Sequence, residues 1–232
     1  MSPRTERALH SPAAVNLIED IVPFPRQHLR VTIPFHTRSG EVLIHAIGAI
    51  REKDGWQISG TEPSEKAREL ALNKITYKEG IKKDLSEFSD SNKGKFDVIT
   101  MWHVLEHVPN LLEYIEKLKE LLAPNGYLIV AVPNFKSHDA IHYKEFWAAY
   151  DVPRHLWHFS EKSIRYIFAK YDFEVIETLP MIFDSFYVSL LSEKNMTGKS
   201  NLISGFKTGL ISNIKARRTN EYSSKIYVIK KG

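Results

Sequence analysis

The clearest pattern of hydrophobic and polar positions lies in the middle of the chain. Residues 96–100 form a short apolar run with β-branched side chains, and the apolar residues of segment 111–123 recur at helical spacing. Residues 127–132 form a second apolar run, typical of a strand that is buried on both faces. Strand, helix and strand with short connections predict a βαβ unit with parallel strands and a right-handed crossover. Because ligands bind beyond the carboxyl ends of such strands, residues 100–110 and 133–138 should border a site.

The rest of the chain extends this pattern to about seven strands with about five helices between them. It predicts a Rossmann-like α/β fold, with a doubly wound, mostly parallel seven-stranded sheet and an antiparallel last strand. We expect residues 1–28 to be a poorly specified N-terminal arm, residues 29–232 to be one α/β domain, and residues 180–223 to be a helical insertion. The other strands are predicted around residues 29–35, 56–62, 80–84, 172–180 and 223–231, and the other helices around residues 43–55, 64–75, 160–171, 183–194 and 201–218.

The composition narrows the class of protein. A chain of 232 residues with 43% hydrophobic residues can bury one full core, and the lack of cysteine excludes disulfides, thiolate zinc sites and cysteine nucleophiles. No apolar run approaches the roughly 20 residues of a membrane-spanning helix, and the start lacks the apolar region of a secretory signal. We therefore expect a cytoplasmic protein. The net charge of +4 comes from dispersed Lys and Arg residues, which does not favour a nucleic-acid partner.

One acidic residue stands at a position that matters for nucleotide binding. Glu62 follows the predicted strand 56–62 and lies 22 positions after Gly40. An acidic residue about 20 positions beyond a glycine-containing strand–helix turn is where a ribose-binding carboxylate belongs. A carboxylate only accepts hydrogen bonds, so it can take both ribose hydroxyls as donors. A solvated Glu at a strand end is the alternative interpretation, and spacing alone does not separate the two.

Several motifs then occur together in a fixed order. They are GTEPSEKAREL at the second strand, KDLSEF after the third, FDVITMWHVLEHVPN at the fourth, LAPNGYLIVAVPN at the fifth, and DVPRHLWHFSEKSI followed by YDFEVIE. In this combination the chain resembles the class I S-adenosylmethionine-dependent methyltransferases of the small-molecule branch, from Gly40 to the C-terminus. The resemblance implies methyl transfer from S-adenosylmethionine to a small-molecule or lipid-like acceptor.

The resemblance also implies roles for individual cofactor-binding residues. Glu62 would bind the ribose hydroxyls of S-adenosylmethionine. Asp84 and Leu85 would lie beside the adenine, with Asp84 accepting a hydrogen bond from its exocyclic amine. Met101 and Trp102 would line the cofactor beside its methionine portion. Gly40 would remain from the glycine-rich first loop.

That first loop departs from the family pattern. The family carries a D-x-G-x-G-x-G type of loop, whereas the equivalent stretch here is Pro34–Glu41, PFHTRSGE, which keeps only Gly40. Glycines there let the backbone turn tightly and approach the cofactor. Three side chains, from His36 to Arg38, stand where the methionine moiety belongs. The pocket is therefore remodelled or damaged, or residues 1–38 are not the native N-terminus of the family. A catalytically impaired binding or regulatory protein is the alternative function.

His103, Glu106 and His107 form an H-x-x-E-H pattern that would share one face of a helix. The same pattern is the inverted zinc-peptidase signature, so a zinc-dependent hydrolase is a remote alternative. The ubiquinone-pathway O-methyltransferases are similar here but carry E-x-x-E-H, with a Glu in place of His103. Magnesium prefers oxygen ligands, so this exchange weakens a metal site and we expect no metal. The favoured interpretation is that Glu106 and His107 form a hydrogen-bonded pair that holds the loop in shape.

A hydroxyl acceptor would gain from a general base, and His suits neutral pH. The candidates are His103, His107, His155 and His158. We favour His155 or His158 as catalytic residues, because the aromatic stretch around them should cap the site. Structural hydrogen bonds in a lid, with no base at all, are the alternative. The resemblance places the following residues on the substrate side: His103, His107, Pro133, Asn134 and Arg154.

The helical insertion at residues 180–223 also lies on the substrate side by this resemblance. Its first helix carries an apolar stripe, and residues 201–218 are amphipathic with a basic end. Four interpretations stay open: a cover for an apolar substrate, a homodimer face, peripheral contact with a membrane surface, and packing against the sheet.

Overall fold

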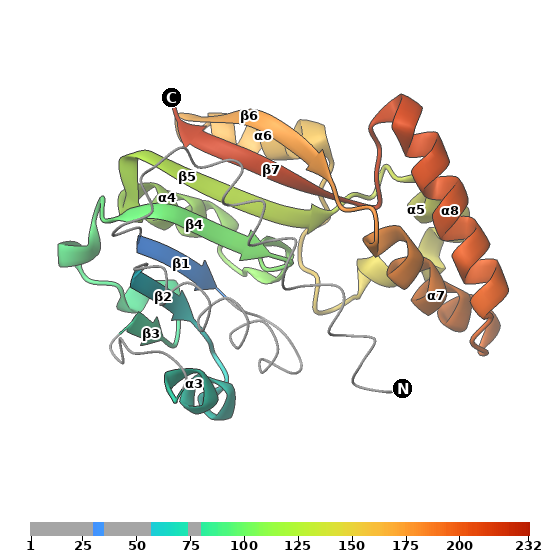
Figure 1. Cartoon of the computed structure of the whole chain (residues 1–232), viewed down its shortest axis with the longest axis horizontal. Helices are drawn as coiled ribbons and strands as arrows, with labels where there is room; N and C mark the ends of the chain where they lie inside the picture. Colours follow the sequence, from blue (N-terminus) through green and yellow to red (C-terminus); the bar gives the residue numbers. More distant parts are fainter. Residues whose placement is uncertain (1–29, 35–56, 74–79) are drawn as a thin grey trace. The chain divides into compact units, whose positions relative to one another are not determined.

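The computed structural model describes residues 30–34, 57–73 and 80–232 (Figure 1). Three predicted features lie outside the described residues: the arm at residues 1–28, the helix around residues 43–55, and Gly40 with the loop that surrounds it.

In the described part of the chain, the strands form one sheet in the order β3-β2-β1-β4-β5-β7-β6. Strand β1 pairs in parallel with both β2 and β4, and β2 pairs in parallel with β3. This arrangement confirms the predicted doubly wound sheet, in which the chain winds outward in two directions from β1. The strands are β1 (Arg30–Pro34), β2 (Gln57–Thr61), β3 (Ile81–Lys82), β4 (Phe96–Trp102), β5 (Leu122–Pro133), β6 (Phe173–Pro180) and β7 (Ser224–Lys231).

The last strand is antiparallel, as the sequence predicts. Figure 1 shows the β7 arrow pointing opposite to that of β6. The connection between them consists of two helices, α7 (Asp184–Thr197) and α8 (Leu202–Thr219). The backbone N–H of Met181, just after β6, donates to the carbonyl of Ser224, the first residue of β7, at 3.1 Å. The helical hairpin therefore returns the chain to the end of β6, and β7 starts there and runs antiparallel to β6.

The described residues group into two compact units. The first contains the described residues up to Met101 together with residues 112–128 and Lys231, and the second contains residues 102–111, residues 129–230 and Gly232. Each unit is described by itself below. No described helix is both long enough and apolar enough to cross a membrane.

In the first unit, helix α4 (Leu111–Leu121) follows the predicted apolar pattern. Its inward positions Ile115, Leu118 and Leu121 are fully buried. Gly126 in β5 permits a close approach, because a Cβ at this position would lie 2.9 Å from the carbonyl oxygen of Phe96 in β4. Helix α3 (Glu65–Leu72), also among the described residues of this unit, follows β2 directly.

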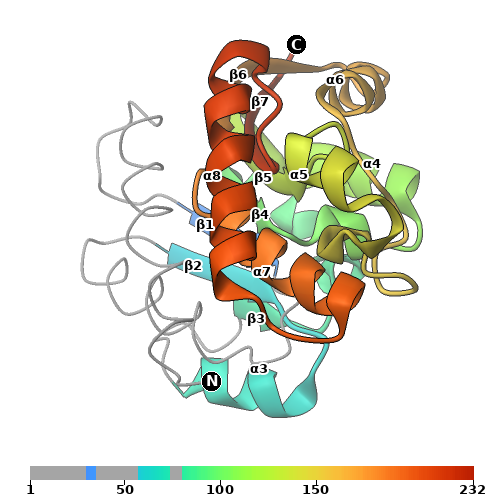
Figure 2. The same cartoon turned by 90° about the vertical axis from the view of Figure 1, so that its right-hand side faces the viewer.

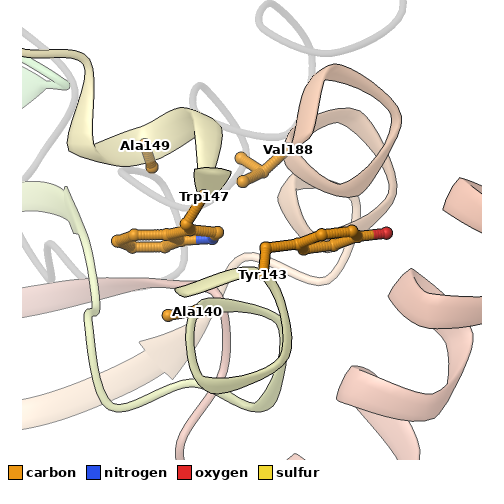
Figure 3. Close-up of a cluster of buried hydrophobic side chains, with 5 residues drawn as sticks. All are labelled: Ala140, Tyr143, Trp147, Ala149 and Val188. Atoms are coloured by element: carbon orange, nitrogen blue, oxygen red, sulfur yellow. The ribbon is translucent and has the colours of Figure 1, made fainter. Parts of the chain in front are cut away.

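The second unit has its own apolar cluster, in which the Trp147 indole lies between Ala140 and Ala149 (Figure 3). The indole nitrogen of Trp147 donates to Asp139 Oδ2 at 2.8 Å, so this buried polar atom is paired. Asp139, at the start of a short helix, also accepts from the hydroxyls of two distant serines. The helices that precede the hairpin are α5 (His138–Tyr143) and α6 (Glu161–Ala169).

Candidate functional site

The carboxyl ends of β2 and β3 are joined in the first unit. Thr61 and Lys82 are partners in the parallel register, and the backbone N–H of Glu62 donates to the carbonyl of Lys82 at 2.9 Å. Glu62 is the first residue after β2, and Asp84 is the second residue after β3. The two carboxylates predicted to bind the nucleoside therefore leave the sheet at the same edge.

Glu62 is buried, and its side chain is held at the entrance to α3. Its Oε1 accepts from the backbone N–H of Ser64 at 2.8 Å. The guanidinium of Arg68, one turn into the helix, donates to the Glu62 carbonyl at 2.8 Å. Backbone and side chain of Glu62 are both fixed, which gives a carboxylate of defined orientation at the strand end.

Asp84 is exposed and uses one of its two oxygens to shape the turn that follows β3. Its Oδ1 accepts from the backbone N–H of Ser86 at 2.7 Å and from the Ser86 hydroxyl at 2.5 Å. No described residue donates a hydrogen bond to Oδ2, which keeps its acceptor capacity for a ligand. Leu85 is buried in the core of this unit, and so is Met101 at the end of β4.

Tyr114 of α4 belongs to the same edge, and the sequence interpretation missed it. Burial raises the pKa of its phenol, the nearby charge of Asp84 raises it further, and a hydrogen bond with the Thr61 side chain opposes both effects. Its pKa thus links this phenol to Thr61 at the end of β2 and to the charge of Asp84 after β3. An aromatic residue with a polar tip, early in the helix after β4, was the available signal in the sequence.

In the second unit, His103 is held between two carboxylates. Its Nδ1 lies 3.2 Å from Glu106 Oε1, and its Nε2 lies 3.0 Å from Asp184 Oδ2. Glu106 is only 1% exposed, and Asp184 is also buried. The backbone of His103 is left-handed, with a φ of 53°, and its N–H donates to the Ala131 carbonyl at 2.9 Å.

These contacts determine the charge of His103. Burial alone would lower its pKa, but Asp184 and Glu106 outweigh burial and raise the pKa to about 10. The ring is therefore a cation at neutral pH, with both nitrogens donating to carboxylates. It braces the loop and has no lone pair with which to accept a proton. Asp184 is a second residue that the sequence interpretation missed, although an acidic residue in the first turn of a helix is a recognised start signal.

The H-x-x-E-H pattern does not form the arrangement that a helix would give. Only Leu105–His107 form a short 3₁₀ turn, and His103 lies outside it with a left-handed backbone. His103, whose nitrogens already bind carboxylates, is therefore not placed to share a metal with Glu106 and His107. The ligating atoms that do gather, all within 4.8 Å of one another, belong to Glu106, His107 and His155. Within the described part of the chain, the buried Oε2 of Glu106 has no hydrogen-bond partner.

The segment around His155 is attached to this loop by its backbone. The N–H groups of Leu156 and Trp157 donate to the Glu106 carbonyl at 2.8 and 3.2 Å. The Trp157 indole donates to the Val108 carbonyl at 2.7 Å. His107 donates through Nδ1 to the carbonyl of Arg154 at 3.0 Å. Four hydrogen bonds thus hold the two segments together, although they are far apart in the sequence.

The two predicted catalytic histidines are anchored by backbone carbonyls. His155 Nδ1 lies 2.7 Å from the Ala149 carbonyl, and His158 Nε2 lies 3.0 Å from the Tyr150 carbonyl. A carbonyl only accepts, so the contacting nitrogen must carry the hydrogen. In the neutral ring, His155 then offers Nε2 as a proton acceptor, and His158 offers Nδ1. The ring of His155 packs edge-on against that of His107 at a centroid distance of 4.6 Å.

The other predicted site residues have varied surroundings in this unit. Asn134 is buried, and its amide donates to Glu221 Oε2 at 2.7 Å and to the Tyr222 carbonyl at 3.0 Å, so its polar atoms are used in the fold. Pro133 is buried at the end of β5, and the exposed Arg154 forms an ion pair with the nearby Asp151. The indole nitrogen of Trp102 is buried and has no hydrogen-bond partner among the described residues.

Comparison with known proteins gives a family match. The profile of the family described as "Methyltransferase domain" matches residues 34–178, more than half of the chain. A ubiquinone biosynthesis O-methyltransferase from Haemophilus ducreyi is 38% identical over 78 residues, which is 32% of this chain and 33% of that protein. The chain therefore spans about a third of the length of the curated relatives it matches.

Solved structures show the same fold at low sequence identity. A SAM-dependent methyltransferase from Archaeoglobus fulgidus superposes with a TM-score of 0.58 at 15% identity, over 94% of this chain and 93% of that one. The [4+2]-cyclase SpnF superposes with a TM-score of 0.62 at 11% identity, over 94% of this chain and 80% of that one. At such identities the likeness concerns the fold alone.

Proposed function

Because the chain belongs to the methyltransferase-domain family, we propose that it transfers a methyl group from S-adenosylmethionine to a small-molecule or lipid-like acceptor. The observation that carries this proposal is the fixed, buried carboxylate of Glu62 at the carboxyl end of β2. A backbone hydrogen bond from Glu62 to Lys82 connects this position to the carboxyl end of β3. Parallel sheets bind their ligands at this edge. A cytoplasmic location and the lack of a nucleic-acid partner remain predictions from the sequence, and a homodimer remains one of its open interpretations.

The residues on this edge suit the polar groups of the proposed cofactor. Glu62 would accept from the ribose hydroxyls, and Asp84 would accept from the adenine amine through Oδ2, which no described residue occupies. In the second unit, the indole N–H of Trp102 is buried without a partner among the described residues, and its place beside the cofactor remains a prediction from the sequence. The cofactor, when bound, supplies a methyl group that is activated by a sulfonium.

The protein's main task in such a displacement is to align the acceptor with the methyl group. For a hydroxyl acceptor, we propose His155 as the general base and His158 as the second candidate. The Ala149 carbonyl fixes His155 with Nε2 as its proton acceptor. The carboxylate of Glu106 lies close enough to stabilise the imidazolium that forms. His103, which is already protonated, would hold Glu106 in place.

A second candidate function is a binding protein that has kept the fold without methyl transfer. The sequence of the first loop favours this candidate, because Pro34–Glu41 retains one glycine where the family has several. The fold is also shared by the cyclase SpnF, whose name describes a different reaction. Cofactor binding without methyl transfer to any acceptor would favour this second function.

Calorimetry with S-adenosylmethionine tests the proposal. We expect binding to the folded wild type, and Glu62→Gln should weaken it by about 10- to 100-fold, since hydrogen bonds to a charged group contribute about 1.5–3 kcal/mol. Glu65→Gln is the matched control, because Glu65 is an exposed acid in the first turn of the neighbouring helix. No binding to the folded wild type, or equal binding by Glu62→Gln, would refute the assigned role of the β2 edge.

A further inference from the structure

Helix α8 presents its small and polar residues to the protein and its large apolar residues to solvent. The buried positions are Gly205, Thr208, Gly209, Ser212, Asn213 and Ala216. Five large apolar residues of the helix remain exposed, and four of them line one side: Ile203 (84%), Phe206 (58%), Leu210 (44%) and Ile214 (54%); the fifth is Leu202, at the start of the helix. We call the four residues on one side the α8 outer face. Figure 2 views the unit with α8 in front. A surface helix of a globular protein normally has the opposite orientation, with its apolar side toward the core.

Close packing against α7 fixes this orientation. A Cβ at Gly205 would lie 2.9 Å from Cα of Leu190, and a Cβ at Gly209 would lie 2.9 Å from Cα of Phe186. Only glycine fits at these two positions, so the backbones of the two helices approach directly. The helix cannot rotate to bury its large apolar side chains without losing this contact.

Hydrogen bonds from the inner side of α8 hold the same orientation. The hydroxyl of Ser212 donates to the fully buried Asp139 at 2.6 Å, and the amide of Asn213 donates to the Ile182 carbonyl at 2.9 Å. The hydroxyl of Ser204 donates to the buried Glu193 at 2.5 Å. Turning the helix would leave these buried acceptors with fewer donors, which costs free energy. Exposure of the outer face is therefore a consequence of the packing.

The outer face is continuous and ordered. Its residues are spaced by three, four and four positions, so they line one side of the helix. The ring of Phe206 stacks on that of Phe186 from α7, with centroids 4.8 Å apart and planes inclined by 25°. Four neighbouring large apolar side chains on one exposed stripe indicate an interaction surface.

The charges around the outer face have one sign. Helix α8 contains no acidic residue, and all its charged residues are cations: Lys207, Lys215, Arg217 and Arg218, each of them exposed. The two acidic residues of α7, Asp184 and Glu193, are buried, whereas its Lys194 is exposed. The whole chain, in contrast, has 32 basic and 28 acidic residues. The exposed charge of these two helices is therefore positive by local arrangement.

We propose that the α8 outer face binds the surface of an anionic lipid bilayer. Apolar side chains in the interfacial region and cations at the level of the phosphates are the two contributions that hold an amphipathic helix on such a surface. Lys207 lies between Phe206 and Leu210 on the exposed side, so its stem can pack along them while its ammonium reaches a phosphate. This inference concerns binding only and does not depend on methyl transfer.

The charge arrangement disfavours a second copy of the chain as the occupant. A twofold dimer would place the same face against itself, because such interfaces are isologous. The cations beside the outer face would then meet one another without an acidic residue on α8 to compensate. An anionic bilayer neutralises them.

The test is flotation of the full chain with lipid vesicles. We expect binding to vesicles of phosphatidylcholine mixed with phosphatidylglycerol, weaker binding in high salt, and little binding to pure phosphatidylcholine. Ile203→Asp should lower binding by at least about tenfold. Lys207→Gln should lower it about fivefold, the effect of one cation near an anionic surface.

Matched controls separate the outer face from general surface effects. Ile141→Asp replaces an exposed isoleucine of α5, and Lys162→Gln replaces an exposed lysine of α6, so both should bind vesicles like the wild type. Circular dichroism checks that every variant is folded. Failure of the folded wild type to float with anionic vesicles would overturn the proposal, as would unchanged binding by Ile203→Asp. A dimer in light scattering that Ile203→Asp dissociates, without vesicle binding, would assign the face to a second copy instead.

Discussion

Replacing His103 by Asn should destabilise the protein strongly, because two carboxylates would lose the cation between them. Asn is the suitable replacement, since it tolerates the left-handed backbone at this position better than most residues. The substitution therefore removes the charge without adding backbone strain. Glu106 and Asp184 would stay buried near each other with no positive charge between them.

The cost can be bounded from the chemistry of the carboxylates. Breaking a buried ion pair by removing one partner costs about 3–5 kcal/mol. The variant can limit this cost by protonating one carboxylate. A pH of 7 lies about 2.7 units above the ordinary pKa of a glutamate, and each unit corresponds to about 1.4 kcal/mol, so this protonation costs about 3.7 kcal/mol. We therefore expect a loss of about 3–4 kcal/mol at pH 7. At pH 5 the same protonation costs about 1 kcal/mol, so the loss should shrink accordingly.

The free energy of unfolding of the wild type should also depend on pH, in this case through the proton that His103 binds. The pKa of His103 is raised from its ordinary 6.5 to about 10 in the folded protein. A raised pKa means that the folded state binds the proton more tightly, so the stabilisation is fully present below pH 6.5. It is lost as the pH rises from 6.5 through about 10. The free energy of unfolding of the wild type should therefore fall over this range.

Urea unfolding, followed by circular dichroism at pH 5, 7 and 9, measures these differences. His142→Asn is the matched control, because His142 is exposed on α5 and has no carboxylate partner among the described contacts. Adding Asp184→Asn to His103→Asn removes one of the two carboxylates and should recover at least about 1.5 kcal/mol. A loss below about 0.5 kcal/mol for His103→Asn at pH 7, typical of an ordinary surface position, would refute the charged brace.

Three further predictions follow from the packing and the site. Gly209→Ala should lower the free energy of unfolding by about 1–3 kcal/mol, because its Cβ would meet the backbone of Phe186 at 2.9 Å; unchanged urea unfolding would contradict this contact. If His155 is the base, His155→Gln should lower kcat by about 10²–10⁴-fold with little change in KM in steady-state kinetics. Dialysis against EDTA should leave activity unchanged, and loss of activity that a divalent metal restores would instead assign a metal to Glu106, His107 and His155.

The sequence predicts those features that depend on local patterns. The two apolar runs of β4 and β5 and the helical spacing of α4 predict the βαβ unit. The position of Glu62 after β2 makes it a candidate ribose ligand. Both signals lie within a few dozen residues of sequence. Asp184 could not be assigned in this way, since it contacts His103 from 81 positions further along the chain. Such a contact depends on how α7 packs, which no local pattern specifies.

The orientation of α8 shows a related limit. Its periodicity predicts an amphipathic helix with one apolar side, but periodicity does not say which side is buried. The usual assumption turns the apolar side inward, whereas Gly205 and Gly209 require the opposite. The two glycines were visible in the sequence, but their close approach to α7 was not. A small-residue stripe opposite an apolar stripe is therefore a reason to consider that a helix packs by its small side.

The histidines illustrate why residue type alone does not assign a role. Four of them were candidate bases, and their hydrogen-bond partners now divide them. His103 donates to two carboxylates, which keep it protonated, so it can position a loop but cannot accept a proton. His155 Nδ1 instead donates to the Ala149 carbonyl, and its Nε2 lies 3.9 Å from Asp151 Oδ2. The partners thus distinguish the two rings: His103 has a carboxylate within hydrogen-bond distance of each nitrogen, whereas His155 has a carbonyl at Nδ1 and, among the described residues, no hydrogen-bond partner at Nε2. The proposal for His155 depends on this difference.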